Sequence, residues 1–257
     1  MKNTDMNNQT VASAKSRGSE LRFRAGMILC ALLAVVLFAC SGKQPQDTET
    51  DPAKKRITKK NARQVLTEYA AQHSDSVVVI ETQYGIIKLR LYDGTPLHRA
   101  SFVRLVRKGF FDTASFYRLV PGMVVQGGHA DKTRLRTESY EVPFETDPQY
   151  YHKRGALGMA HHDGAKGSSP YDFYIVQGTV MTEDSVRAAN ENTGLPLLDS
   201  QLRDYVSTGG APHLDYRYTV FGEVIDGIGI VDSIAAEALV PNTERPKRKI
   251  PAKISLQ

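Results

Sequence analysis

Seven short segments rich in β-branched and aromatic residues limit the folds that this chain can adopt. They are separated by turns and polar stretches, and they do not alternate regularly with helices as the strands of a parallel sheet would. The segments cover residues 77–81, 86–92, 115–120, 123–126, 155–160, 173–177 and 218–224. Gly85 lies at the turn between the first two, which therefore form a predicted hairpin. The pattern predicts a mainly β fold, either an antiparallel barrel or a sandwich.

Helical patterns flank and interrupt the predicted strands. Apolar residues at helical spacing predict a leading helix in 57–75. Thr95 and Pro96 open a second helix that runs to about Gly109, with Thr as the N-cap and Pro at the first helical position. A last helix covers about 228–238. Weak helical patterns at 182–192 and 199–207 fall in the polar stretch 178–212, which we interpret as a helical insertion rather than a second domain.

The amino terminus predicts export and lipid attachment. Two arginines precede an apolar run over 25–39, which is short for a membrane span of roughly 20 residues but suits the centre of a signal peptide. The run ends in Leu-Phe-Ala-Cys, which resembles a bacterial lipobox and implies cleavage before Cys40 and lipid on its sulfur. We expect a signal peptide over 1–39, with Met6 as an alternative start, and a flexible tether over 40–56. The lipoprotein would face the periplasm at the cell envelope, and Ser41 favours the outer membrane.

The charge distribution argues against a nucleic-acid partner. The net charge is +5, but residues 1–40 hold five basic and two acidic side chains, so the remaining 217 residues carry only +2. A nucleic-acid-binding protein would show a clustered basic face. The one basic cluster of the body, RPKRK at 245–249, is interpreted as solvated surface.

One permanent charge lies in a run that otherwise looks buried. In SFYRLVPGMVVQGGHAD, residues 115–131, Arg118 stands between apolar segments. It is either a surface side chain whose head group reaches solvent or an electrostatic group at the floor of an apolar pocket.

Four segments, in order, resemble the signature segments of the cyclophilin-type peptidyl-prolyl cis-trans isomerases. They are FYRLVPGMVVQGG at 116–128, GALGMAHH at 155–162, DFYIV at 172–176 and HLDYRYTVFGEV at 213–224. The resemblance covers about residues 76–234, and we assign the enzyme domain to 76–257. It implies a closed eight-stranded antiparallel β-barrel capped by two helices, and an isomerase that assists the folding of exported proteins without a cofactor or a metal.

The resemblance also implies the residues of the site. Arg118 corresponds to the catalytic Arg, and Gln126 to the Gln that binds the substrate backbone and helps to orient that Arg. The implied substrate-binding residues are Phe116, Met123, Val124, Ala160, His161, Asp172, Phe173, Tyr174, Leu214 and Tyr218. Phe173 fits a core position as well. Met123 and Tyr174 stand where the family has Phe, and Asp172 where it has Gln.

The reaction gives the Arg a physical task. Rotation about an Xaa-Pro bond has a barrier of roughly 18–20 kcal/mol, because resonance joins the nitrogen to the carbonyl. In the twisted transition state the prolyl nitrogen regains its lone pair, so a donor directed at it stabilises that state more than either ground state. Arginine is always protonated and offers rigid donors.

Three other interpretations stay open at the level of sequence. The first is a lipid-anchored binding module that holds Pro-containing segments with little or no turnover. The second is a structural lipoprotein of the envelope, and the third is a metal site formed by His161, His162 and Asp163 with His129. The expected partners are proline-containing polypeptides and, through the lipid alone, a membrane; the chain is expected to be a monomer that binds no nucleic acid.

Overall fold

The computed structural model describes residues 55–128, 138–191 and 193–257, which all fall within one compact unit of the chain, 49–257. The predicted signal peptide, Cys40 and most of the tether lie outside the described residues, and so does His129. Within the described ranges, no helix is long and apolar enough to cross a bilayer.

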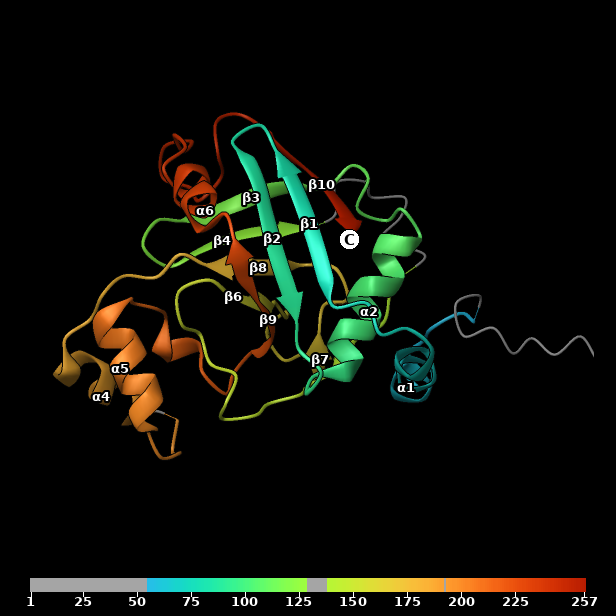
Figure 1. The fold of residues 1–257 in the computed structure, drawn as a ribbon, viewed down its shortest axis with the longest axis horizontal. Helices are drawn as coiled ribbons and strands as arrows, with labels where there is room; N and C mark the ends of the chain where they lie inside the picture. The colour runs from blue at the N-terminus through green and yellow to red at the C-terminus, as the bar shows by residue number, and fades with distance from the viewer. Residues whose placement is uncertain (1–54, 129–137, 192) are drawn as a thin grey trace, which may run out of the picture. The chain divides into compact units, whose positions relative to one another are not determined.

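Eight strands close into an antiparallel barrel (Figure 1), which confirms the predicted fold class. Their order around the barrel is β1, β10, β3, β4, β8, β6, β9 and β2. The strands are β1 Val77–Thr82, β2 Gly85–Leu91, β3 Ser115–Val120, β4 Val124–Gly128, β6 Ala156–Met159, β8 Phe173–Val176, β9 Thr219–Asp226 and β10 Ile250–Leu256. A separate pair joins β5 Val142–Pro143 to β7 Gly167–Ser168. The barrel interior is the main core, in which Val125, Ile175 and Leu157 are register partners on three neighbouring strands and are fully buried.

The eighth strand was missed by sequence reasoning. β10 pairs with both β1 and β3 and so closes the barrel. Its alternation is regular: Ile250, Ala252 and Ile254 are buried, whereas Pro251 and Lys253 are exposed. This period of two is the ordinary signal of a half-buried strand.

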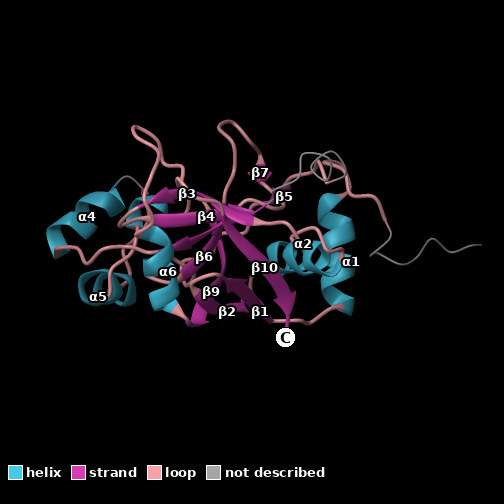
Figure 2. Ribbon diagram, turned by 90° about the horizontal axis from the view of Figure 1, so that it is seen from above, coloured by secondary structure: helices cyan, strands magenta, loops and turns pink. Residues whose placement is uncertain are grey.

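Five α-helices surround the barrel in the described part of the chain. They are α1 Ala62–Gln72, α2 Pro96–Arg107, α4 Glu183–Glu191, α5 Asp199–Ser207 and α6 Ile228–Ala235, and a short 3-10 turn, η1 Pro212–Leu214, follows α5. Figures 1 and 2 show α1 and α2 side by side at one end, and α4 and α5 together at the other. Helices α4 and α5 lie in the predicted insertion, residues 178–212.

The start of α2 corrects one detail of the sequence analysis. Thr95 does occupy the N-cap position, but its hydroxyl makes no capping bond and has no partner within the described residues. Glu145 from a distant loop takes that role, because its carboxylate accepts from the backbone N–H of Leu97 and of His98, each at 2.9 Å. A carboxylate at a helix amino terminus also meets the positive end of the helix dipole.

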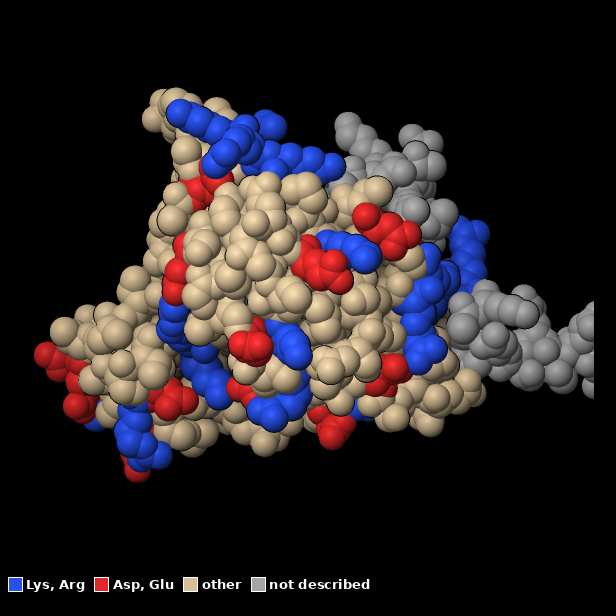
Figure 3. Space-filling view, turned by 45° about the horizontal axis from the view of Figure 1, so that its top comes forward, with Lys and Arg blue, Asp and Glu red and all other residues tan. Residues whose placement is uncertain are grey.

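Charges of both signs are spread over the face seen in Figure 3, and Lys and Arg gather at its upper edge. Part of the basic segment at 245–249 is paired: Arg248 lies 2.9 Å from Glu237. The expectation that the chain binds no nucleic acid stays a prediction.

Candidate active site

A row of side chains crosses the outer face of four neighbouring strands. Arg118 on β3 is the register partner of Gln126 on β4, which is the partner of Tyr174 on β8, which is the partner of Gly158 on β6. Because successive residues of a strand point to opposite faces, this row faces away from the barrel core. The strand pairing thus brings together residues that are 56 positions apart at most, from Arg118 to Tyr174.

A β-bulge in β3 explains why two consecutive residues belong to the outer face. The register shifts between Phe116 and Arg118, so Tyr117 and Arg118 are both partly exposed while Phe116 and Leu119 are both buried in the core. An extra residue in one strand changes the alternation in this way, and bulges commonly re-aim a side chain. The lone charge of the apolar run therefore lies outside the core, at the edge of a pocket.

Two acceptors fix the guanidinium of Arg118. Its Nη1 donates to Oε1 of Gln126 at 3.1 Å, and its Nε donates to Oε2 of Glu244 at 2.6 Å. The loop that carries Glu244 is itself tied to β3, because the backbone N–H of Leu119 donates to the carbonyl of Glu244 at 2.7 Å. Since Arg118 and Glu244 are about 39% and 50% exposed, the ion pair mainly holds the side chain in place and contributes little stability.

The amide of Gln126 is oriented in turn by a tyrosine. Nε2 of Gln126 donates to the hydroxyl of Tyr117 at 2.9 Å, and that hydroxyl donates to Oδ1 of Asp172 at 2.8 Å. Burial, followed by the nearby charge of Asp172, raises the pKa of Tyr117, so the phenol keeps its proton and remains a donor. Because the amide nitrogen is engaged by Tyr117, the amide oxygen faces Arg118.

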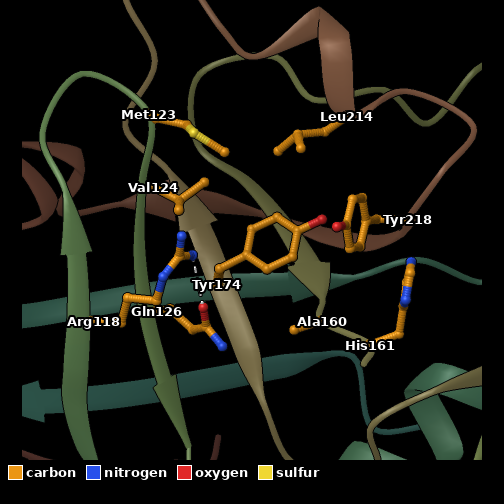
Figure 4. A pocket seen from close by; sticks show the side chains of 9 residues that line it. All are labelled: Arg118, Met123, Val124, Gln126, Ala160, His161, Tyr174, Leu214 and Tyr218. Atoms are coloured by element: carbon orange, nitrogen blue, oxygen red, sulfur yellow. Dashed lines mark hydrogen bonds between the residues drawn. The ribbon is translucent and has the colours of Figure 1, made fainter. Parts of the chain in front are cut away.

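An apolar slot lies beside the guanidinium (Figure 4). Its lining consists of Arg118, Met123, Val124, Gln126, Ala160, His161, Tyr174, Leu214 and Tyr218. Val124, Tyr174 and Leu214 belong to a small buried cluster that is separate from the barrel core. The structure therefore brings together both predicted catalytic residues and seven of the ten predicted substrate-binding residues.

Tyr174 lies across the floor of this slot. It is 4% exposed, and its ring makes an edge contact with Tyr218, with ring centroids 6.1 Å apart. The ring covers Gly158, where a Cβ atom would stand 2.3 Å from Cζ of Tyr174. Only a residue without a side chain leaves room for the ring there. In Figure 4 the hydroxyl of Tyr174 points towards Tyr218.

Three predicted substrate-binding residues do not line the slot. Phe116 and Phe173 are buried in the barrel core, 6.0 Å apart between ring centroids, on the inner faces of β3 and β8. Asp172 is 7% exposed, and its carboxylate accepts from Tyr117 and, at 2.9 Å, from Ser169. Their contact with substrate stays a prediction, and Asp172 is linked to the site through Tyr117, which in turn accepts from Gln126.

His161, the first histidine of the 161–163 segment, is engaged in ordinary contacts. The ring of His161 stacks on Tyr218 with centroids 4.4 Å apart, and its Nδ1 lies 3.0 Å from the carbonyl of His162. Over the described ranges, no three His, Cys, Asp or Glu side chains are grouped so as to hold a metal ion.

Sequence reasoning missed two members of the site, Tyr117 and Glu244. Tyr117 had a signal, since a hydroxyl stands directly before the arginine in an apolar run. Glu244 had none, because its position opposite Arg118 depends on how the loop before β10 folds back on β3. Chemically, the arrangement presents N–H donors of a permanent cation to an apolar slot whose floor is an aromatic ring.

Comparison with known proteins identifies similar chains. A family model described as cyclophilin type peptidyl-prolyl cis-trans isomerase/CLD matches residues 77–255, which confirms the resemblance and extends it beyond residue 234. A "Putative peptidyl-prolyl cis-trans isomerase" of Staphylococcus saprophyticus subsp. saprophyticus is 30% identical over 168 residues, covering 64% of this chain and 83% of the relative. The protein of the same description from Staphylococcus aureus is 29% identical over 175 residues, 66% of this chain and 86% of that relative.

Two further similarities are more limited. A "Putative bifunctional phosphatase/peptidyl-prolyl cis-trans isomerase" of Streptococcus pyogenes is 31% identical over 169 residues, but the match spans 63% of this chain and only 35% of that protein. The crystal structure of a cyclophilin type peptidyl-prolyl cis-trans isomerase of Cryptosporidium parvum, solved in the presence of the dipeptide Ala-Pro, has a TM-score of 0.52. It shares 20% identity, over 70% of this chain and 98% of that one, and so supports the fold.

Proposed function

Because the chain belongs to the cyclophilin-type peptidyl-prolyl cis-trans isomerases, and is an enzyme of that class, we propose that Arg118 carries its catalytic step. In this proposal a guanidinium N–H donates to the prolyl nitrogen when the Xaa-Pro bond is twisted. The observation that carries the proposal is the placement of Arg118, held through Nε and Nη1 at the edge of an apolar slot.

The donation favours the transition state specifically. A planar amide nitrogen is a poor acceptor, because its lone pair is shared with the carbonyl. Twisting the bond returns the lone pair to the nitrogen, so the hydrogen bond becomes strong only at the top of the barrier, which is the condition for catalysis. A single preorganised donor of this kind is worth about 10²- to 10³-fold in rate.

The slot would hold the proline ring during rotation. Val124, Leu214 and the ring of Tyr174 offer apolar surface, and burial of apolar surface is worth about 25 cal/mol per Å². With the ring held, the peptide segment before proline rotates against it. The partners of the enzyme are accordingly proline-containing polypeptides.

Turnover of a proline peptide by the wild-type protein tests this function. Exchange between the cis and trans forms, followed by NMR, should speed up in the presence of catalytic amounts of protein. Binding of the peptide without any acceleration would instead favour the second candidate, a module that holds Pro-containing segments. That candidate is motivated by Met123 and Tyr174, which stand where the family has Phe in the pocket.

We place this activity at the bacterial cell envelope, on exported polypeptides. One support is the apolar run over 25–39, which Cys40 follows directly. The other is chemical: uncatalysed isomerisation takes tens to hundreds of seconds, and a catalyst that needs no ATP can act outside the cytoplasm. Mass spectrometry of the mature protein should find Cys40 as the lipid-modified first residue. Cys40→Ser should release the protein from the membrane fraction, and retention of that variant on the membrane would contradict the anchor.

A further inference from the structure

A chain of buried hydrogen bonds joins the insertion to the floor of the slot. The hydroxyl of Tyr205 on α5 donates to Oδ2 of Asp215 at 2.6 Å. Oδ1 of Asp215 accepts from the backbone N–H and from Nδ1 of His152, each at 2.8 Å. Nε2 of His152 lies 2.9 Å from the hydroxyl of Tyr174. We refer to Tyr205, Asp215, His152 and Tyr174 as the relay; none is more than 4% exposed.

The direction of each bond follows from the chemistry of the groups. A carboxylate only accepts, so Asp215 fixes Nδ1 of His152 as a donor. In the neutral tautomer the other ring nitrogen then accepts from the hydroxyl of Tyr174. Burial, above all other causes, raises the pKa of Tyr174 well above its ordinary value, so this hydroxyl keeps the proton that it donates.

The backbone ties the same elements together at the base of the insertion. The two ends of the insertion meet there, because Gly210 forms an isolated bridge with Thr179. Gly210 forms a second bridge with Lys153, which lies next to His152. The two segments of backbone approach so closely that a Cβ on Gly178 would stand 2.6 Å from Cα of Gly210. The N–H of Ala211 donates to the carbonyl of His152 at 2.8 Å. The insertion therefore holds two segments in place. One is the loop that carries His152, and the other is the turn that carries Leu214 and Asp215.

We propose that the insertion is the specificity-determining element of the slot, and that Tyr205, Asp215 and His152 are positioning residues that fix the ring of Tyr174. This proposal rests on the proposed function. It adds which residues determine how large a ring the slot can admit. A ring tied by its hydroxyl cannot withdraw to admit a larger substrate ring. The substrate class that follows is proline itself, with exclusion of six-membered imino acids such as pipecolate.

Removing one hydroxyl should loosen the floor without removing any lining atom. In Tyr205→Phe, Oδ2 of Asp215 loses its buried donor, and a buried carboxylate oxygen without a partner is unfavourable, so Asp215 and His152 would shift towards other donors. The ring of Tyr174 then loses its fixed acceptor. Arg118 is not part of the relay, so the catalytic donor is unchanged.

The test compares peptides that differ only in carrying proline or pipecolate. One extra methylene in a well-defined pocket is worth about 10- to 200-fold in discrimination. We expect wild type to favour the proline peptide by at least about tenfold in kcat/KM. Tyr205→Phe should lower that ratio at least about threefold, through a lower KM for the pipecolate peptide at nearly constant kcat.

A matched control and a double variant separate this role from a general loss of stability. Tyr151→Phe removes a tyrosine hydroxyl bond between the loop before β6 and α5, to Asp204 at 2.6 Å. The ring of Tyr151 packs against Tyr205 and stays in place in this variant, and its hydroxyl is not part of the relay, so the wild-type ratio should be kept. In the background of Tyr174→Phe the relay has lost its last member, so the further change Tyr205→Phe should have no added effect.

The outcomes are distinguishable. Two results would overturn the role of the relay. One is an equal proline-to-pipecolate ratio of kcat/KM for wild type, Tyr205→Phe and Tyr151→Phe. The other is an additive effect of Tyr205→Phe and Tyr174→Phe in the double variant. If the wild-type protein binds the peptides without turnover, the proposed function fails and the relay is judged by the dissociation constants of the same two peptides. The same loss of discrimination in binding would then support it, and unchanged constants would overturn it.

Discussion

Arg118 and Gln126 are eight residues apart in the sequence and directly opposite each other on β3 and β4, with Nη1 3.1 Å from Oε1. The turn between them is tight, because Gly122 adopts a positive φ of 79° and its N–H donates to Oε1 of Gln177 at 2.7 Å. The proposed catalytic donor and the side chain that orients it are thus carried by paired strands rather than by loops. Sites built on such elements keep their geometry better than sites on loops.

The first prediction concerns the orientation of Gln126. Tyr117→Phe removes the hydroxyl that accepts from Nε2, so the amide can turn its nitrogen towards Arg118 and repel it. A steady-state assay on a proline peptide should show kcat/KM reduced by about three- to tenfold, the loss expected for one misplaced hydrogen bond. The matched control is Tyr84→Phe, which removes a hydroxyl bonded to Glu237, outside the slot. Equal activity of Tyr117→Phe and Tyr84→Phe would show that Tyr117 does not orient the amide.

The second prediction concerns the room beneath Tyr174. Gly158→Ala places a Cβ 2.3 Å from Cζ of that ring, so the ring must tilt into the slot. We expect KM for the proline peptide to rise at least about tenfold, with thermal stability reduced by the strain, of the order of 1–3 kcal/mol. Gly229→Ala is the control, since a Cβ at that helical position meets no atom within 4 Å. An unchanged KM in Gly158→Ala would contradict the position of the ring.

The third prediction concerns stability in mild acid. His98 is fully buried, with Nδ1 2.6 Å from Glu145 and Nε2 2.9 Å from Ser168. Burial lowers its pKa despite the nearby Glu145, so the folded protein keeps the ring neutral. Below about pH 6.5 the unfolded chain takes up a proton at this residue and the folded one does not, so the free energy of unfolding falls as the pH falls.

Urea unfolding at pH 7.5 and 5.5 measures this effect. The free energy of unfolding of wild type should decrease towards pH 5.5 by up to about 1.4 kcal/mol per pH unit from this group. His98→Asn keeps a donor for Glu145 but does not titrate, so its stability should depend less on pH. Parallel pH profiles of the two proteins would exclude His98 as the cause.

Local patterns predicted most of the strands, whereas the closed barrel and the residues of the slot followed from the resemblance to the family. The period of two in the strands and the spacing of Arg118 and Gln126 across a Pro-Gly turn do not depend on distant parts of the chain. β10 was missed although Ile250, Ala252 and Ile254 carry the same period. The signal was present, but a charged segment, residues 245–249, directly precedes it.

Other features could not be predicted from the sequence. Phe116 belongs to the core because a bulge changes the face of β3, which is not visible in the order of residues, whereas the core position of Phe173 is one that the sequence analysis allowed. Glu244 meets Arg118 only through the folding back of a loop. The relay joins residues 63 positions apart from His152 to Asp215, and it depends on tertiary packing around the insertion.

The central claim is that Arg118 stabilises the twisted bond and not the bound peptide. NMR line shapes of a proline peptide give both the exchange rate on the protein and the dissociation constant. For Arg118→Ala we predict a rate on the protein that is lower by about 10²- to 10³-fold, with a dissociation constant within about threefold of wild type. Arg90→Ala, which removes an exposed arginine paired with Glu223 on the far strands, should leave both unchanged. An Arg118→Ala variant that isomerises the bound peptide as fast as wild type would contradict the account.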